Sequence, residues 1–255
     1  GEEIGKGAKP FVAAGVLEGA ERVFGLHTAY DLEAGTVGLK PGINNAAVDH
    51  FRIRVHGKST HVSTPHLGVD ALYIASQIVV AVQGLVTRRT SPTEPVIIGI
   101  GKLNAGTTYN AVAAFAEMEG TTRTISQESR DRVRAQVSET AQSIAALYGG
   151  TAEVEWTDFA AALVNDPQVC EEAARVVDEL LGAGHVVTDR ELSLSGDNFA
   201  EFELYKPGAY AYLGTGNPDL PHTMITNHNG GFDVDENALV TGAGLYVGYT
   251  VARLG

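Results

Sequence analysis

Hydrophobic and polar positions in the middle of the chain follow the two periods expected of a mixed helix and strand unit. Residues 51–56 alternate apolar and charged side chains, the period-two pattern of a half-buried strand. Residues 69–88 predict a long, largely buried helix, and residues 127–147 carry one apolar stripe opposite charged positions. Three further strands are expected at residues 96–103, 112–122 and 152–156. The order strand–helix–strand–strand–helix–strand predicts a ferredoxin-like α+β module over about residues 47–160.

The segments on either side of this module predict an α/β domain. Short apolar runs indicate strands at residues 23–27, 36–39 and 209–213. Asp166 can cap a helix whose first turn holds Pro167. Further helices are expected near residues 197–204 and from about residue 236. The simplest architecture is therefore an α+β module inserted into an α/β domain that is made of residues 1–46 and 161–255.

The net charge of the chain limits which classes of molecule it can bind. The 255 residues include 31 acids and 18 bases, a net charge of -13, which argues against nucleic acid and against an anionic membrane. No apolar run approaches the roughly 20 residues of a membrane helix. A small anionic substrate stays compatible with this charge if a metal ion or local Arg and His residues reverse the potential in one pocket. The single cysteine, Cys170, excludes an internal disulfide and fits a reducing compartment, so we expect a cytoplasmic protein.

Two adjacent carboxylates and two isolated histidines are candidates for metal ligands and for a general base. Glu2 and Glu3 open the chain, His27 follows an apolar run, and His228 lies in a polar, glycine-rich stretch. Glu3, His27 and His228 are donors suited to zinc, manganese, cobalt or nickel. Glu2 could take a proton from a water activated by the metal. Each residue alone is more simply a solvated or hydrogen-bonded side chain, and the metal hypothesis depends on their position where strands or glycine-rich loops meet turns.

The inserted module offers a second set of polar residues. His61 follows a strand among small polar residues, Asn110 lies in a tight loop between two expected strands, and Arg123 ends a strand. A histidine, an amide and a guanidinium could together bind a polarised carbonyl oxygen and a substrate carboxylate. Singly, each is a common loop or rim residue.

Three apparent motifs are discounted. The G-x-G at residues 99–101 has no third glycine and no helix behind it, which argues against a dinucleotide site. The G-K-G at residues 5–7 lacks the spacing of a phosphate-binding loop. Ser195 lacks the G-x-S-x-G turn, so a serine hydrolase is disfavoured.

Taken in order, many short segments match one known family. The chain resembles, over essentially its whole length, the aminoacylase-like metallohydrolases, which include hippurate hydrolase, the plant indole-acetyl-amino-acid hydrolases and bacterial N-acyl-amino-acid amidohydrolases. The matching segments are G-E-E at 1–3, G-L-H at 25–27, G-K-S-T-H at 57–61, P-H-L-G-V-D at 65–70, G-T-T-Y-N at 106–110, E-G-T-T-R-T at 119–124, G-D-N-F at 196–199, L-G-T-G-N-P at 213–218, and His228 ahead of F-D-V-D-E at 232–236.

The resemblance implies roles for these residues. In that family two divalent metal ions, here Zn, Mn, Co or Ni, share a site in the larger domain, and the smaller domain dimerises. Glu2 would be the general base, and Glu3, His27 and His228 would be metal ligands. His61 and Asn110 would reach toward the partner subunit's site to hold the scissile carbonyl. Arg123 would hold the substrate's α-carboxylate.

Three departures from the family pattern qualify this reading. The family's other ligands come from an upstream C-G-H-D-x-H-T segment that this chain does not contain, so the resemblance implies an α/β catalytic domain truncated at its N-terminus and a partial metal site. Asn198 stands where many relatives have Asp. The residues around His228 also differ from the usual L-H-S-P-x-F.

The leading hypothesis is a metal-dependent amidohydrolase that cleaves N-acyl or N-aroyl amino acids or related small amides. The alternative is a truncated or degenerate relative that dimerises and binds acyl-amino acids without hydrolysing them. A module that serves only to bind a partner protein is a third hypothesis, and it leaves the candidate ligands unexplained. The helix expected at residues 69–88 is apolar nearly all round, which predicts a homodimer formed through a strand edge or helix contact of the inserted module.

Overall fold

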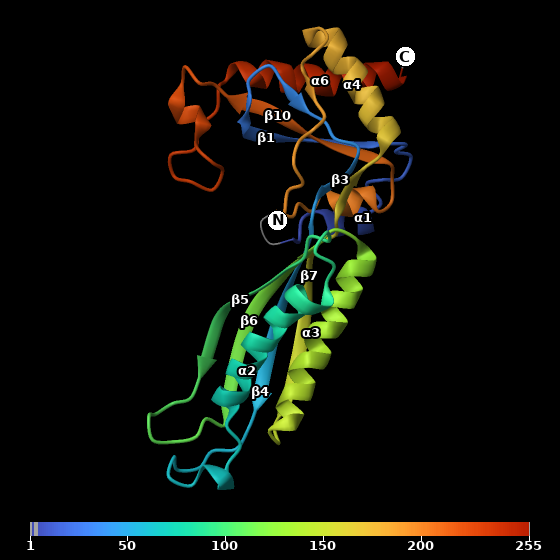
Figure 1. Cartoon of the computed structure of the whole chain (residues 1–255). Coiled ribbons are helices and arrows are strands. Elements are labelled where there is room, and N and C mark those ends of the chain that lie inside the picture. The colour runs from blue at the N-terminus through green and yellow to red at the C-terminus, as the bar shows by residue number, and fades with distance from the viewer. Residues whose placement is uncertain (1, 3–4, 255) are drawn as a thin grey trace. The chain divides into compact units, whose positions relative to one another are not determined.

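The computed structural model describes Glu2 and residues 5–254, which divide into two compact units. The first unit comprises residues 1–45, 163–193 and 197–255. The second comprises residues 46–162 with 194–196. Because the second unit is an α+β module set within the sequence of an α/β unit, the predicted fold class is confirmed (Figure 1).

The second unit has the ferredoxin-like order of elements. Its helices and strands are β4 (Ala47–His56), α2 (Ala71–Gly84), β5 (Ile97–Ala105), β6 (Phe115–Thr124), α3 (Gln127–Leu147) and β7 (Thr151–Ala160). The sheet order is β5-β6-β4-β7, and each neighbouring pair is antiparallel. A short 3-10 helix, Pro65–Leu67, lies in the loop between β4 and α2.

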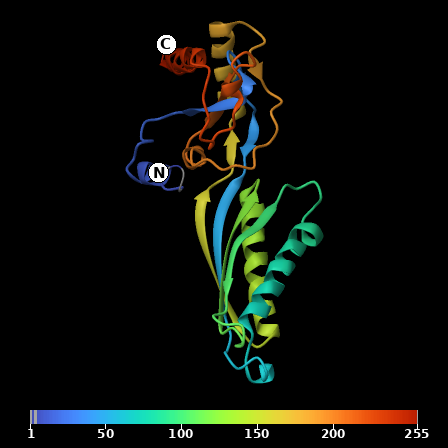
Figure 2. The same ribbon diagram turned by 90° about the vertical axis from the view of Figure 1, so that its left-hand side faces the viewer.

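Both helices cover one face of this sheet, as Figure 2 shows. The strand β4 buries Phe51, Ile53 and Val55 against that face, which follows from the alternation in its sequence. Gly120 on β6 makes room for the Phe51 ring, because a Cβ atom there would lie 2.3 Å from Phe51 Cζ. The open face carries the charged residues of the same strands.

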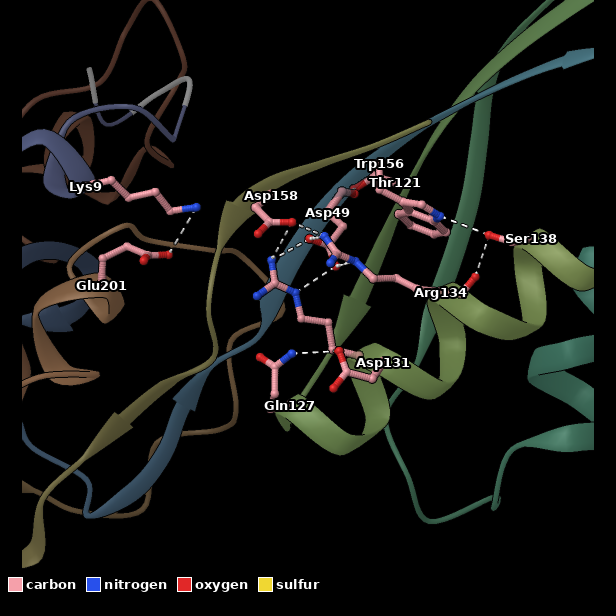
Figure 3. A network of polar contacts seen from close by, with 11 residues as sticks. Lys9, Asp49, Thr121, Gln127, Asp131, Arg134, Ser138, Trp156, Asp158 and Glu201 are labelled. Atoms are coloured by element: carbon pink, nitrogen blue, oxygen red, sulfur yellow. Dashed lines mark hydrogen bonds and ion pairs between the residues drawn. The ribbon is translucent and has the colours of Figure 1, made fainter. Parts of the chain in front are cut away.

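A buried carboxylate attaches α3 to the sheet. Asp49 of β4 is 1% exposed and accepts hydrogen bonds from two arginines of α3. Arg130 donates from Nε (2.9 Å) and Nη2 (2.5 Å), and Arg134 donates from Nε (3.1 Å) and Nη2 (2.7 Å). Arg134 also pairs with Asp158 of β7 and lies over the Trp156 ring (Figure 3). Helix α3 is therefore held by a charge network as well as by its apolar stripe.

Helix α2 is less buried than the sequence predicted. Its inward residues are fully buried, whereas Leu72, Tyr73 and Val80 are 49%, 45% and 70% exposed. The helix continues as a π-helical turn, Leu85–Arg89. The run Ala71–Arg89 is long and apolar enough to cross a membrane by length and composition, which the sequence analysis did not expect. One such helix is weak evidence, because the core helices of soluble proteins pass the same test.

The first unit is built on a mixed sheet. Its strands are β1 (Val23–Glu33), β2 (Val37–Gly38), β9 (Val186–Val187) and β10 (Gly208–Gly216), in the order β1-β10-β2-β9. β1 and β10 are parallel, with Val23 opposite Gly208. Two short strands, β3 (Gly42–Asn45) and β8 (Leu163–Asn165), pair with each other as the chain leaves and re-enters the unit.

Helices lie on both sides of this sheet. Its helices are α1 (Ala8–Ala13), α4 (Pro167–Leu181), α5 (Ala200–Glu203), the 3-10 helix η4 (Pro221–Met224) and α6 (Asn237–Leu254). Asp166 caps α4 as expected, by accepting from the backbone N–H groups of Gln168 and Val169. Cys170 of α4 is buried and free, in the core that α4 and α6 form with the sheet.

Two features of this unit differ from the sequence prediction. β1 was expected to end at His27, yet it continues to Glu33, so His27 lies in the strand interior. β3 and β8 were not predicted, because four and three residues give too short an alternation to recognise.

Candidate active site

The first unit carries its polar candidates on one face of the β1–β10 pair. Gly25 is opposite Tyr210 and His27 is opposite Tyr212, so these four residues share a face. The opposite face packs Leu26 and Ala211 into the core with α4 and α6. Because side chains alternate along β1 and β10, one face of this strand pair packs into the core and the other carries the polar candidates.

His27 presents one free ring nitrogen. Its Nδ1 lies 2.7 Å from the carbonyl oxygen of Thr28, and because a carbonyl only accepts, Nδ1 carries the proton. Nε2 then keeps its lone pair. This is the arrangement in which histidines bind metal ions in proteins, with the second nitrogen donating to a carbonyl. The imidazole lies 6.1 Å from the Tyr210 ring and 5.9 Å from the Tyr212 ring, measured between ring centroids.

Tyr210 is held at both its backbone and its side chain. The Asn165 side chain accepts from Tyr210 N (2.8 Å) and donates to Tyr210 O (3.0 Å), and Asn44 donates to the same oxygen (3.0 Å). The Tyr210 hydroxyl donates to Asp197 Oδ2 at 2.5 Å. The ring packs on Phe199, with centroids 5.3 Å apart. These buried bonds leave Tyr210 little freedom to move.

Tyr212 is held in a similar way on the next inward position of β10. Its hydroxyl donates to Asn45 Oδ1 at 3.0 Å, and its ring meets Tyr210 edge to face at 5.7 Å. Arg190 lies over the other side of the ring, 4.3 Å from its centroid, and pairs with Asp31 at 3.0 Å. A cation over a tyrosine face is a stabilising contact.

Of the two predicted carboxylates, the structure describes Glu2 and does not describe Glu3. Burial raises the pKa of the Tyr210 phenol most, followed by Asp197 and Tyr212, and the charge of Glu2 is the smallest of the causes. Glu2 itself is exposed. The predicted metal ligand Glu3 lies outside the residues that the structure describes.

His228 lies in the loop that follows η4, and η4 packs on β1 and β10. Its side chain is exposed and its backbone is left-handed, with φ of 61°. The neighbouring Asn227 Oδ1 is buried and has no hydrogen-bond partner among the described residues. Within residues 2 and 5–254, no group of three His, Cys, Asp or Glu side chains converges as a metal site. The described residues therefore supply one imidazole with a fixed tautomer, that of His27, and not a complete set of metal ligands.

In the second unit, His61 and Asn110 lie on adjoining loops. Val62 N donates to Asn110 O (3.1 Å) and Val112 N donates to Thr60 O (2.8 Å), which ties the loop after β4 to the loop between β5 and β6. Lys58 and Val69 exchange two further backbone bonds. Gly57 permits this closure, because a Cβ atom there would lie 2.2 Å from Val69 O.

Among the residues that the structure describes, both side chains on these loops have an acceptor that is bonded and a donor that makes no bond. Ser63 N donates to His61 Nδ1 at 3.2 Å and Ser63 Oγ lies 2.7 Å from the same nitrogen, so when the Ser63 hydroxyl also donates to it the neutral ring carries its proton on Nε2. Asn110 Oδ1 accepts from Thr108 Oγ1 at 3.1 Å, which leaves the amide N–H groups unused. Both residues are exposed. The loops thus present two hydrogen-bond donors from a fixed backbone, a suitable set for an oxygen that gains negative charge.

Arg123 is a half-buried cation on β6. Burial lowers the pKa of its guanidinium and is the one cause found, so no described residue gives it a hydrogen bond or an ion pair. Along β6 it alternates with the buried Thr122 and Thr124, which places it on the open face of the sheet. A desolvated guanidinium without a protein anion is suited to an anionic ligand.

Sequence analysis missed the groups that support His27. Tyr210, Tyr212, Asn45 and Asn165 were not among the candidates. One local signal was available, since two tyrosines separated by Ala211 predict two aromatic rings on one face of a strand. Their asparagine partners are more than 40 residues away along the chain, and the pattern of the sequence does not reveal them.

Comparison with known proteins gives consistent matches. A family model described as the peptidase dimerisation domain of the M20 type matches residues 46–148. The chain is 36% identical over 239 residues to an N-acetyl-L-cysteine deacetylase of Bacillus subtilis, covering 94% of this chain and 55% of that protein. It is 34% identical to thermostable carboxypeptidase 1 of Saccharolobus solfataricus, covering 93% of this chain and 59% of that protein.

A solved structure agrees with these relatives. The YxeP protein of Bacillus subtilis, described as a dinuclear metal-binding peptidase of the M20 family, superposes with a TM-score of 0.80 at 32% identity. The match covers 99% of this chain and 62% of that one, so the chain spans about three fifths of the length of the proteins it matches. The sequence motifs, the inserted module and these likenesses together show that the chain is similar, over nearly its whole length, to proteins of the M20 peptidase family.

Proposed function

We propose that this chain is part of a metal-dependent amidohydrolase that cleaves the amide bond of N-acyl or N-aroyl amino acids. The observation that carries the proposal is the pair of free donors, His61 Nε2–H and Asn110 Nδ2–H, on two loops fixed to each other by backbone hydrogen bonds. An amide carbonyl gains negative charge on its oxygen when water attacks. Donors that need no rearrangement stabilise that charge in the transition state.

The remaining candidates take complementary roles in this proposal. Glu2 accepts a proton from the attacking water and delivers it to the nitrogen of the leaving amine. Arg123 binds the α-carboxylate of the substrate, and its lack of a protein anion supports that role. His61 and Asn110 would serve the site of the partner subunit.

The proposed ligands are Glu3, His27 and His228, together with donors that relatives carry upstream. Of these, His27 fits a metal ion on its observed geometry, because Nδ1–H donates to Thr28 O and Nε2 is free. When bound, a divalent ion such as Zn, Mn, Co or Ni supplies Lewis-acid activation of water and of the amide carbonyl. The dinuclear description of the YxeP protein supports divalent ions in general.

The test is Glu2→Gln in the full-length protein, with Glu18→Gln as a matched control at another exposed acid. Turnover of N-acyl amino acids and metal content are measured together. We expect Glu2→Gln to lower kcat by about 100-fold or more, since general-base catalysis contributes on the order of 10²–10⁴. Metal content should stay unchanged, and the control should behave as wild type. Near-normal turnover in Glu2→Gln would remove this mechanism.

A relative that binds acyl-amino acids without hydrolysing them is the second candidate. It is favoured by one observation, that the described residues do not assemble three metal-binding side chains. Metal content and hydrolysis of the 255-residue chain and of a version extended upstream separate the two. The amidohydrolase proposal expects metal and activity in the extended version, while stoichiometric metal in the shorter chain would contradict the partial site inferred here.

We also propose that the protein is a homodimer formed through the second unit. The match to a dimerisation domain supports a homodimer in general terms. Leu72, Tyr73 and Val80 expose apolar surface on α2, and α2 packs on the β5 and β6 side of the sheet, where β5 is an edge strand. Sedimentation at micromolar concentration tests this, and a monomer would exclude a role for His61 in a neighbouring site.

A further inference from the structure

We propose that Tyr210 and Tyr212 are positioning residues for the His27 imidazole, forming a fixed aromatic wall that sets the direction of Nε2. The inference rests on the proposed function, because it assigns His27 as a metal ligand. It concerns two residues to which neither the sequence motifs nor the resemblance gave a role.

The first argument is how His27 is surrounded. The imidazole faces the Tyr210 ring at 50° and the Tyr212 ring at 57°, with centroids 6.1 and 5.9 Å away. A single hydrogen bond to Thr28 O fixes the tautomer, yet it leaves the ring free to pivot about that bond. Contact with two rings on one side limits the pivot. Loss of a hydrogen-bonding partner that orients a ligating histidine lowers metal affinity by about 10–100-fold, and for these ring contacts we expect the lower end of that range.

The second argument is how firmly the wall itself is held. The hydroxyl of Tyr210 donates to Asp197 Oδ2, and that of Tyr212 donates to Asn45 Oδ1. Asn45 is 2% exposed and Asn165, which bonds both backbone groups of Tyr210, is 1% exposed. Buried and fully bonded polar networks fix one conformation. A tyrosine needed only for packing would not require this many specific partners.

The third argument is a contrast within the same unit. Tyr249 of α6 is also buried (6% exposed), and its hydroxyl donates to a carboxylate, Glu172 Oε2, at 3.2 Å. Its ring stacks on Phe24, which lies on the opposite face of β1 from His27. Tyr249 therefore has the chemistry of Tyr210 without contact to the candidate ligand, which makes it a matched control.

The experiment uses the full-length protein and compares Tyr210→Phe, Tyr212→Phe, the double variant and the control Tyr249→Phe. Affinity for Zn²⁺ and Mn²⁺ is measured by competition with a chelator, and thermal stability is measured in parallel. Tyr210→Phe and Tyr212→Phe should each lower metal affinity about 10-fold. Tyr249→Phe should lose stability only. At saturating metal these two variants should recover most of the wild-type kcat, because the tyrosines act only through His27, the proposed metal ligand.

The outcomes separate this inference from the proposed function. His27→Ala is the reference, and it should abolish tight binding at one metal site. If His27→Ala leaves metal affinity unchanged, the ligand assignment and the proposed metal chemistry fail. If His27→Ala loses the metal while the double tyrosine variant binds it as tightly as Tyr249→Phe does, the positioning role is overturned and the metal chemistry stands.

Discussion

The two edges of the sheet in the second unit differ in almost every property that governs association. On the β5 side the edge strand contains Gly99 and Gly101, and the neighbouring helix α2 exposes Val80. On the β7 side the edge strand exposes Glu153 and Glu155, and the neighbouring helix α3 exposes mainly acidic and polar residues, with Leu147 exposed at its last turn. Free strand edges invite pairing, and charged side chains on an edge prevent it.

This contrast teaches which side is open to a partner. The β7 side is completed internally, because α3 is held by Asp49 and its two arginines, and the edge carries like charges that repel a second copy. The β5 side is less protected: its edge carries Lys102 and a register shift between Ile100 and Lys102, and the apolar residues exposed beside it on α2 remain to be covered.

Removal of the charge on Asp49 should have the largest effect. Asp49→Asn leaves Arg130, which is 6% exposed, without its main anion, and breaking a buried ion pair costs about 3–5 kcal/mol. Urea denaturation of the variant measures this loss. The control is Asp131→Asn on the exposed side of α3, where the carboxylate bonds only Gln127 and the expected cost is below about 0.5 kcal/mol. Equal stability of the two variants would show that α3 does not depend on the network.

Glu203 of the first unit is a buried carboxyl without a cation, the opposite case to Asp49. Burial first, and then the charges of Asp197 and Asp166, raise its pKa to about 7. Oε2 accepts from Val164 N at 3.0 Å, while Oε1 is buried and has no partner among the described residues.

The sign of the pH effect follows from that raised pKa. Between the unfolded pKa of 4.5 and the folded value of about 7, the folded state holds the proton and the unfolded state loses it, so stability falls as pH rises. Glu203→Gln should therefore stabilise the protein by about 2–3 kcal/mol at pH 8 and by little at pH 4.5. Thermal denaturation across this range is the measurement. A variant with an unchanged pH profile would refute the raised pKa.

A charge on the exposed side of α2 should weaken the dimer. Val80→Glu places a carboxylate in the proposed interface. We expect it to raise the Kd of the dimer about 100-fold, which is about 2.7 kcal/mol of association free energy. Sedimentation equilibrium measures the change. Ala135→Glu at an exposed position of α3 is the matched control and should leave the dimer intact. Loss of the dimer in the control alone would assign the interface to the other side of the sheet.

Neutralising the β7 edge should have the smallest effect on folding. Glu153→Val with Glu155→Val removes the pairs to His56 and Arg54, which are surface pairs worth less than about 1 kcal/mol in total. The edge should nevertheless gain a tendency to associate, visible as light scattering that rises with protein concentration. A variant that scatters as wild type does would mean that the acidic residues do not protect this edge.

Much of the fold could be predicted because its signals are local. Helix α3 was predicted at residues 127–147, its observed bounds, from its apolar stripe and from Gly149 and Gly150 after its end, and the structure adds the cap at Ser126. The sequence of strands and helices along the second unit followed from strand alternation and from the apolar stripes of its helices. The extent of β1 was underestimated, because its continuation from Thr28 depends on pairing with β10 and not on its own pattern.

The candidate site was only partly predictable for the same physical reason. His27, His61, Asn110 and Arg123 stand at positions that strand and loop patterns can locate. Their supports depend on contacts between distant segments, such as Tyr212 with Asn45, 167 residues apart. Nothing in a local sequence window records that bond. Glu3 belongs to neither case, since it lies outside the described residues.

The three asparagines around the tyrosine pair have a mechanical consequence. Asn44 and Asn45 lie on β3 and Asn165 lies on β8, the two short strands through which the chain passes to and from the inserted module. All three bond directly to Tyr210 or Tyr212. Substitution of any one of these asparagines should therefore loosen both the short strand that carries it and the tyrosine beside His27.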